Sequence, residues 1–147
     1  MSQRENIIAD IVTTLETITK ANSYTYDINT VTRDVKHFRE LNGYPSILVL
    51  NGGQAYEPED VGAAYLRSNL IVRLRGMVRA TSSIETVANY FLNDIETALC
   101  ADDARRCGDY AEDTHPYNLK MYDGKDDDIQ IFDFDFEIWY NYLYGSP

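Results

Sequence analysis

The chain has 147 residues, a length typical of one domain, which we expect to span residues 1–147. Its formal net charge of −11 argues against binding nucleic acid through phosphate neutralisation, because that mode requires an excess of Lys and Arg. Its apolar runs fall well short of the ~20 residues of a membrane-spanning helix, and polar residues interrupt its N-terminal segment. We therefore expect neither a membrane partner nor a signal peptide.

The N-terminal segment predicts an amphipathic helix over residues 3–20. Ser2 and Glu5 have the spacing of a capping box, in which the hydroxyl and the carboxylate satisfy free backbone amides at a helix start. Apolar residues follow at helical spacing: Ile7, Ile8, Ile11, Val12, Leu15 and Ile18. Polar and apolar residues then alternate from Tyr24 to about Val35, which predicts a first strand.

The middle of the chain predicts two more strands with a loop between them. Residues 47–50 are apolar on both faces, which is typical of a central strand. The Asn-Gly-Gly sequence at 51–53 is a strong turn signal, and residues 54–64 have the composition of an exposed loop. Residues 66–80 alternate between apolar and basic side chains, and Gly76 is the expected position of a bulge.

The second half of the chain predicts one helix and two strands. A second capping box at 82–85 begins a helix that we expect to end near Ala101. Residues 102–117 have no clear period and predict an irregular loop. A short strand around Leu119 then leads to a last, long strand over residues 129–142, with a hairpin turn beginning at Asp123-Gly124.

The element order α, β, β, β, α, β, β predicts an α+β fold. Hairpins join neighbouring strands, so we expect a mostly antiparallel β-sheet of about four to five strands. Both helices are expected to pack on one face of that sheet, because each carries a single apolar stripe.

The last predicted strand has an acidic face. Asp133, Asp135 and Glu137 alternate with phenylalanines, so their carboxylates line one strand face and repel one another across ~7 Å. Arginines on the strand at 66–80 have the same period and the opposite sign: Arg73, Arg75 and Arg79. If the two strands are neighbours, the stripes pair across the sheet and fix its register. Trp139 lies on the acidic face, where it favours a protein interface.

We expect no enzyme, no cofactor and no metal site. The sequence lacks the short motifs of serine hydrolases, zinc proteases, phosphate-binding loops and dinucleotide-binding folds. His37 and His115 have no partners at ligand spacing, and Cys100 and Cys107 are seven residues apart, which is not a zinc pattern. We expect both thiols to be reduced. The acidic segment 123–128 lacks the residue spacing of a calcium-binding loop.

In its order of elements the chain resembles the tail terminator (tail completion) proteins of long-tailed bacteriophages, of the lambda minor-tail type. The resemblance covers nearly the whole chain and is one of pattern. It rests on five segments, which read RENIIADIVTTLETI, YTYDINTVTRDV, YPSILVLNGG, NLIVRLRGMVRATSSIETVANYFLNDIETALCADD and IQIFDFDFEIWYNY.

The resemblance implies a structural role in a virion. Such proteins form a ring, usually six-fold, that caps the head-proximal end of the tail tube and ends its polymerisation. The implied partners are further copies of the chain in a hexameric ring, the tail tube protein, a head connector or stopper protein, and a sheath protein where the tail has one. Genomic DNA would pass through the lumen without specific binding, and assembly would take place in the host cytoplasm.

The resemblance also gives the candidate residues a setting. The lumen or the subunit interface would be formed by Asp133, Asp135, Glu137, Arg73, Arg75, Arg79 and Trp139. Contacts with the tube or the connector are expected from the polar loops 53–65 and 102–118, although solvated loops without a partner have the same composition. In these loops the candidates are Tyr56, Glu57, Glu59, Asp60, Arg105, Arg106 and Tyr110.

Two other functions remain open from the sequence. Stoppers and head–tail adaptors share parts of the same pattern. An acidic inhibitor that mimics DNA would use the carboxylate stripe in place of phosphates. Such a mimic acts as a monomer or dimer, whereas a terminator acts as a ring.

Overall fold

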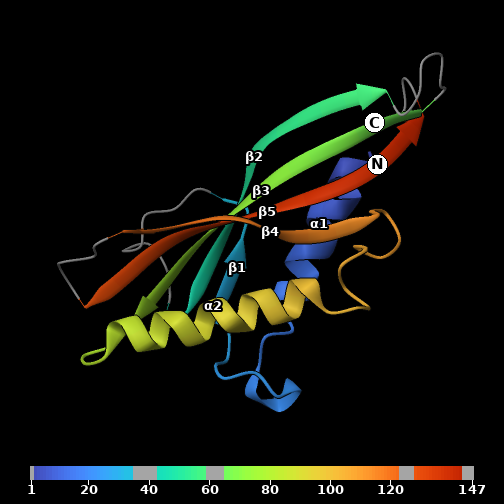
Figure 1. Cartoon of the computed structure of the whole chain (residues 1–147). Coiled ribbons are helices and arrows are strands. Elements are labelled where there is room, and N and C mark those ends of the chain that lie inside the picture. The colour runs from blue at the N-terminus through green and yellow to red at the C-terminus, as the bar shows by residue number, and fades with distance from the viewer. Residues whose placement is uncertain (1, 35–42, 59–64, 123–127, 144–147) are drawn as a thin grey trace.

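A computed structural model of the chain describes residues 2–34, 43–58, 65–122 and 128–143. These residues form a five-stranded sheet with two α-helices, so the expected α+β class is confirmed (Figure 1). The elements are α1 (Gln3–Leu15), a short 3₁₀ helix η1 (Lys20–Asn22), β1 (Thr30–Thr32), β2 (Ser46–Pro58), β3 (Tyr65–Arg79), α2 (Ile84–Cys100), β4 (Asp113–Tyr122) and β5 (Ile129–Leu143).

The strands lie in the order β1-β2-β3-β5-β4. β1 runs parallel to β2, and every other neighbouring pair is antiparallel, as the sequence predicted for most of the sheet. β5 is the last strand of the chain and lies between β3 and β4. This central position explains its near-continuous burial, because a central strand has neighbours on both sides.

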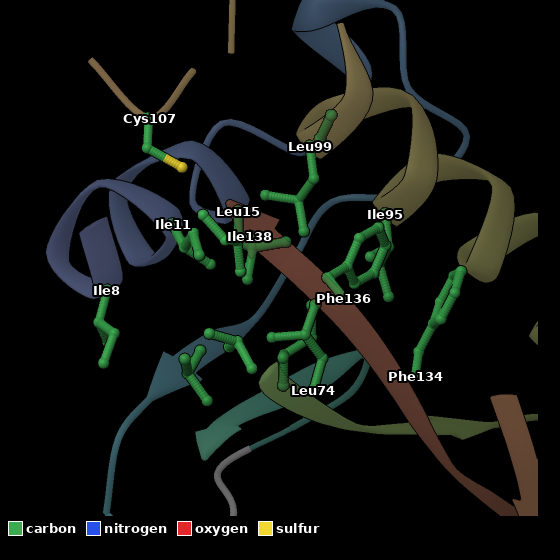
Figure 2. Close-up of a cluster of buried hydrophobic side chains, with 14 of the residues drawn as sticks. Ile8, Ile11, Leu15, Leu74, Ile95, Leu99, Cys107, Phe134, Phe136 and Ile138 are labelled. Carbon is green, nitrogen blue, oxygen red and sulfur yellow. The ribbon is translucent and has the colours of Figure 1, made fainter. Parts of the chain in front are cut away.

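Both helices pack on the same face of the sheet, as expected (Figure 1). The core between the helices and the sheet is built from apolar residues of α1, α2, β3 and β5, and Figure 2 shows several of them converging: Ile8, Ile11, Leu15, Leu74, Ile95, Leu99, Phe134, Phe136 and Ile138. Complete burial of one such side chain stabilises the fold by roughly 1.5–3 kcal/mol. The alternation in β5 therefore fixes which of its faces turns toward the helices.

The start of α1 is as predicted, but its end is not. The Ser2 hydroxyl accepts a hydrogen bond from the backbone N–H of Glu5 at 3.1 Å, which confirms the N-cap. The helix ends at Leu15 rather than near residue 20. Ile18 is nevertheless fully buried, so the last residue of the apolar stripe reaches the core from irregular backbone.

The first predicted strand is much shorter than its alternation suggests. Within the described residues Thr30–Thr32 is the part of it that pairs with β2, and Val35 lies outside them. The carboxylate of Asp94, on α2, accepts hydrogen bonds from the backbone N–H groups of Thr25 and Tyr26 at 3.1 Å. The backbone N–H of Ile28 likewise binds the carbonyl of Ile18. Backbone groups satisfied in this way are not available to a sheet, so the alternation here does not produce a strand.

The predicted turn at residues 51–53 is wrong. β2 continues through it to Pro58 and pairs with β3 along its whole length. The register shifts between Asn51 and Gly53, so the extra residue is absorbed as a bulge. Gly53 has a φ of 114°, a conformation that glycine adopts without strain. The predicted loop therefore begins after Pro58, and residues 59–64 lie outside the described part of the chain.

The predicted bulge at Gly76 is also wrong, because the register between β3 and β5 is unbroken there. Gly76 lies opposite Phe132, and a Cβ at this position would be 2.1 Å from Cζ of the phenylalanine ring. The glycine is therefore required by close packing of that ring.

Two predictions in the second half of the chain need correction. β4 begins at Asp113, so the irregular segment is shorter than the predicted 102–117. Ser83 precedes α2 in a left-handed conformation with φ 55° and makes no side-chain capping bond, so the second capping box does not form. The hairpin turn predicted at Asp123-Gly124 lies outside the described residues.

Candidate functional site

The face of the sheet away from α1 and α2, here called the outer face, carries the predicted charge stripes. Arg73 on β3 lies opposite Asp135 on β5, and Arg75 lies opposite Asp133. Each pair is joined by two hydrogen bonds. Nε and Nη2 of Arg73 donate to Asp135 at 2.9 and 3.1 Å, and the same atoms of Arg75 donate to Asp133 at 2.8 and 3.1 Å. The predicted pairing of the two stripes is thus confirmed at these four residues.

The partners of each pair differ in their exposure. Asp133 and Asp135 are only 3 and 4% exposed, whereas the side chains of Arg73 and Arg75 are 43 and 39% exposed. The Tyr122 hydroxyl, on β4, donates a further hydrogen bond to Asp133 at 2.9 Å. The outer face therefore does not present free carboxylates at these positions, because arginine side chains cover them.

These contacts determine the ionisation of the site. Burial raises the pKa of Asp133, but hydrogen bonds from Arg75 and Tyr122 and the charges of the two arginines outweigh it, so the pKa is lowered from 3.8. Hydrogen bonds to the aspartates in turn raise the pKa of both Arg73 and Arg75. The Arg75–Asp133 pair is thus charged at neutral pH.

Glu137, the third acid of the stripe, pairs with no arginine among the described residues. It lies opposite Ile71 on β3. Its carboxylate accepts hydrogen bonds from Nδ2 of Asn69 at 2.6 Å and Nε1 of Trp139 at 2.7 Å, and Nε2 of His115 is 2.9 Å away. The hydrogen-bonding capacity of this carboxylate is therefore met by an amide, an indole and a histidine rather than by an arginine.

Arg79 does not take part in the charge pairing, which corrects the prediction of a third pair. The register that joins Arg75 to Asp133 places Arg79 opposite Ile129, beyond the acidic residues of β5. Arg79 is exposed, and no ion pair of it is found within the described parts of the chain. The shared spacing correctly predicted that arginines of β3 pair with acids of β5. The two stripes are offset along their strands, however, so Arg79 and Glu137 do not lie opposite each other.

Trp139 is held on the outer face by contacts within the chain. The guanidinium of Arg67 lies over its ring, 4.3 Å from the centroid, which is a cation–π geometry. Its indole N–H is occupied by Glu137. The side chain is only half-buried, so part of the indole remains on the surface. The prediction that it contributes to an interface stays open.

Candidates from both predicted loops lie beside the start of α1, since Nε2 of Gln3 donates to the backbone carbonyl of Tyr110 and Nη2 of Arg4 donates to the hydroxyl of Tyr56. Arg105 makes two hydrogen bonds to Asp113, at 2.7 and 2.9 Å, and thereby fixes the start of β4. Arg106 is 3.9 Å from Asp109, and Tyr110 is 43% exposed. The remaining candidates lie in or after β2: Tyr56 is 49% exposed and its hydroxyl accepts from Arg4 at 2.7 Å, the side chain of Glu57 is not described, and Glu59 and Asp60 lie outside the described residues.

The cysteines and histidines form no ligand cluster in the described residues, where no group of three or more metal-binding side chains is found. His37 lies outside this part of the chain. Cys100 and Cys107 are free thiols. Burial raises the pKa of Cys107 to about 11, so its thiol is protonated at neutral pH. Neither described helix is long and apolar enough to cross a membrane.

Sequence reasoning predicted a short strand around Leu119 but missed the full length of β4 and the exposure of its apolar side chains. Three side chains of β4 are among the large apolar residues most open to solvent: Tyr117 at 61%, Leu119 at 45% and Met121 at 41%. The only signal in the sequence was the short alternation around Leu119. The extension of this strand back to Asp113 has no such signal, because Pro116 and a register shift interrupt it.

No protein-family model matches the chain, and no curated protein matches it. Among solved structures, its fold is similar to that of a chain in the virion of a native gene transfer agent particle, with a TM-score of 0.50 and 14% sequence identity. The similarity covers 96% of this chain and 92% of that one. It therefore establishes a shared fold over nearly the full length of both chains.

Proposed function

We propose that this chain is a structural protein of a phage-like virion and acts there as a tail terminator. The observation that carries the proposal is the full-length similarity of its fold to a chain of a gene transfer agent virion. The order of elements in the sequence supports the same class independently, because it resembles the tail terminators of long-tailed phages. Fold and sequence pattern thus favour one setting.

In this role, copies of the chain form a ring on the head-proximal end of the tail tube. The ring stops addition of tube protein and offers its other side to the head connector or stopper. The outer face supplies the lumen or the subunit interface. Arg73 and Arg75 suit such a surface, because their side chains hold the aspartates with one edge while about two fifths of their area stays exposed.

The ion pairs change how the lumen would repel DNA. Asp133 and Asp135 are neutralised by arginines, so they contribute little net charge to a DNA-facing surface. Repulsion of the phosphate backbone would come from the remaining acidic excess of a chain with net charge −11. The same burial weakens the alternative of a DNA mimic, because a mimic requires carboxylates on its surface.

The test is tube assembly with and without this protein. Tail-tube protein of the same virion is polymerised alone or with the purified chain, and tube lengths and ends are measured by negative-stain electron microscopy. We expect tubes that stop growing and carry a ring at one end. Tubes that grow unchanged with bare ends would overturn the terminator role. Binding to the connector but not to the tube would indicate a stopper or adaptor instead.

A matched pair of variants tests the outer face. Replacing both aspartates by lysine, as D133K/D135K, leaves four cations together and should abolish capping. A charge-swapped control with R73D, R75D, D133R and D135R restores both pairs in reversed orientation. If capping depends only on a correctly paired sheet, the swapped variant caps tubes normally. If the exposed guanidinium groups contact a neighbour, it folds but caps poorly, as the proposal expects.

A further inference from the structure

The sheet has an open edge on each side. β1 covers only Ser46–Leu48 of β2, so residues 49–58 of β2 pair with β3 alone. At the other side, β4 pairs with β5 alone. In the described parts of the chain no further strand joins either segment. Unpaired backbone N–H and C=O groups at such edges can pair with a strand of another chain.

Exposed apolar side chains gather at these two edges. Tyr117, Leu119 and Met121 lie on β4, and Tyr56 lies on the open segment of β2. Leu119 and Met121 stand opposite Phe134 and Phe132, on the helix side of the sheet, yet they remain 45 and 41% exposed. Proteins usually protect edge strands with charges, so an apolar edge indicates a surface that is covered by a partner.

A second copy of this chain is suited to be that partner, because each copy carries both open edges and the proposed ring requires contacts between copies. Two copies repel each other through their net charge of −11, so they must meet where acids are few. The open segment 49–58 has one acid, Glu57. β4 has one acid, Asp113, which binds Arg105, and one base, Lys120. Both edges therefore have the low charge that is typical of the centre of an interface.

We propose that copies of the chain join edge to edge, with β4 of one copy pairing with the open segment of β2 in the next. The regular stretches 54–57 and 118–122 are suited to this pairing, because the register shifts of both strands and the two prolines, Pro58 and Pro116, lie outside them. Pairing of two different edges is heterologous and therefore continues around a ring or along a filament. The tail role requires a ring, but it does not say which surfaces meet.

The experiment uses one variant for each edge. Leu119→Lys with Met121→Lys places charge on β4, and Ala55→Lys with Tyr56→Lys places it on β2. Tyr90→Lys is the matched control, since Tyr90 is an exposed aromatic residue on α2, away from both edges. Molar mass is measured by light scattering over a wide concentration range, and folding is checked by circular dichroism and thermal melting.

We expect the wild type and the control to assemble and each edge variant to stay monomeric, with at least a tenfold weaker association. A mixture of the two edge variants should form a one-to-one dimer that cannot grow, because each retains the edge that the other has lost. If one edge variant fails to fold, Tyr117→Lys replaces it on β4, or Ala55→Lys alone on β2.

Three results would overturn the proposal. They are a wild type that is monomeric at every concentration, an edge variant that assembles like the wild type, and a mixture that stays monomeric. A β2 variant that still dimerises alone would show that two β4 strands pair with each other instead. The tube assay is scored separately, so a protein that assembles through these edges but ignores tubes overturns the terminator role and leaves the edge pairing intact.

Discussion

The helix-covered face of the sheet is apolar, whereas the outer face is held by ion pairs across β3 and β5. On the first face Phe136 and Ile138 are completely buried beneath α1 and α2 (Figure 2). On the second, Arg73 and Arg75 lie over Asp135 and Asp133 and remain two-fifths exposed. Burial of one large apolar side chain is worth ~1.5–3 kcal/mol, whereas the cost of burying each aspartate offsets much of the free energy that its ion pair gains.

The two faces of the sheet therefore have different roles. The helix-covered face supplies most of the folding free energy. The paired charges fix the register of β3 on β5, because a one-residue slip would turn each buried aspartate toward the apolar core and leave its charge unpaired. The outer face holds its charged side chains in a defined register and leaves the arginines accessible to solvent. It is therefore also suited to contacts with other chains.

The largest effect should come from the helix-covered face. Phe136→Ala removes a fully buried ring and should lower the free energy of unfolding by ~3–5 kcal/mol, through lost burial and the cavity left behind. The matched control is Tyr117→Ala, because Tyr117 is 61% exposed and its loss should change stability by no more than ~0.5 kcal/mol. Urea unfolding followed by circular dichroism measures both. Equal losses would contradict the division between the two faces.

A smaller effect on the same face should come from Gly76→Ala. The added Cβ would overlap the ring of Phe132, so the ring must move, at a cost of ~1–3 kcal/mol. The same substitution in a Phe132→Leu background should cost less, because the ring is then absent. Urea unfolding of the four proteins in this cycle gives the coupling between the two positions. Additive losses would mean that Gly76 is needed for another reason.

The elements that could be predicted from the sequence are those fixed by local periodicity. The alternation in β5 predicted which of its residues face the helices. The matched period of the arginines and the acids predicted that β5 lies beside β3. The register then followed for two pairs because charge complementarity selects it. The stripe could not reveal where the pairing ends, since Arg79 and Glu137 have the right period but lie opposite Ile129 and Ile71.

The elements that could not be predicted depend on distant partners. Residues 51–53 read as a turn, but the strand continues because β3 is long enough to pair with both halves of β2. The alternation after Tyr24 read as a strand, but Asp94, almost seventy residues away, takes up the backbone N–H groups of Thr25 and Tyr26. In both cases long-range hydrogen bonds override a local signal.

On the outer face, Asp133→Asn should lower the free energy of unfolding by ~1–3 kcal/mol at neutral pH. The substitution weakens two bonds from Arg75 and one from Tyr122 while the position stays buried. Because the folded-state pKa of Asp133 lies below 3.8, its stabilisation is fully present above that value and is lost as pH falls through the folded-state pKa.

The pH dependence separates the ion pair from simple packing. Urea unfolding of wild type and variant from about pH 7 to about pH 2 should give a stability difference that is constant near neutrality and shrinks below about pH 4. The Phe136→Ala difference has no titrating group at the site and should change little over the same range. A difference for Asp133→Asn that is independent of pH would show that the carboxylate stabilises by its shape alone.

The smallest effect on stability should come from an ion pair in which both partners are exposed. It tests whether burial distinguishes one ion pair of the chain from another. Arg33 contacts Glu5 on α1, and both side chains are 40% exposed. Arg33→Gln should therefore reduce stability much less than Asp133→Asn does, and the reduction should vanish in ~1 M salt, where charges are screened within ~3 Å. The Asp133→Asn difference should persist in the same salt, because its carboxylate is buried beneath the arginine. Urea unfolding in low and high salt measures both. Equal salt dependence of the two variants would mean that burial does not protect the outer-face pairs from screening. Their role in fixing the register would then be no greater than that of any surface charge.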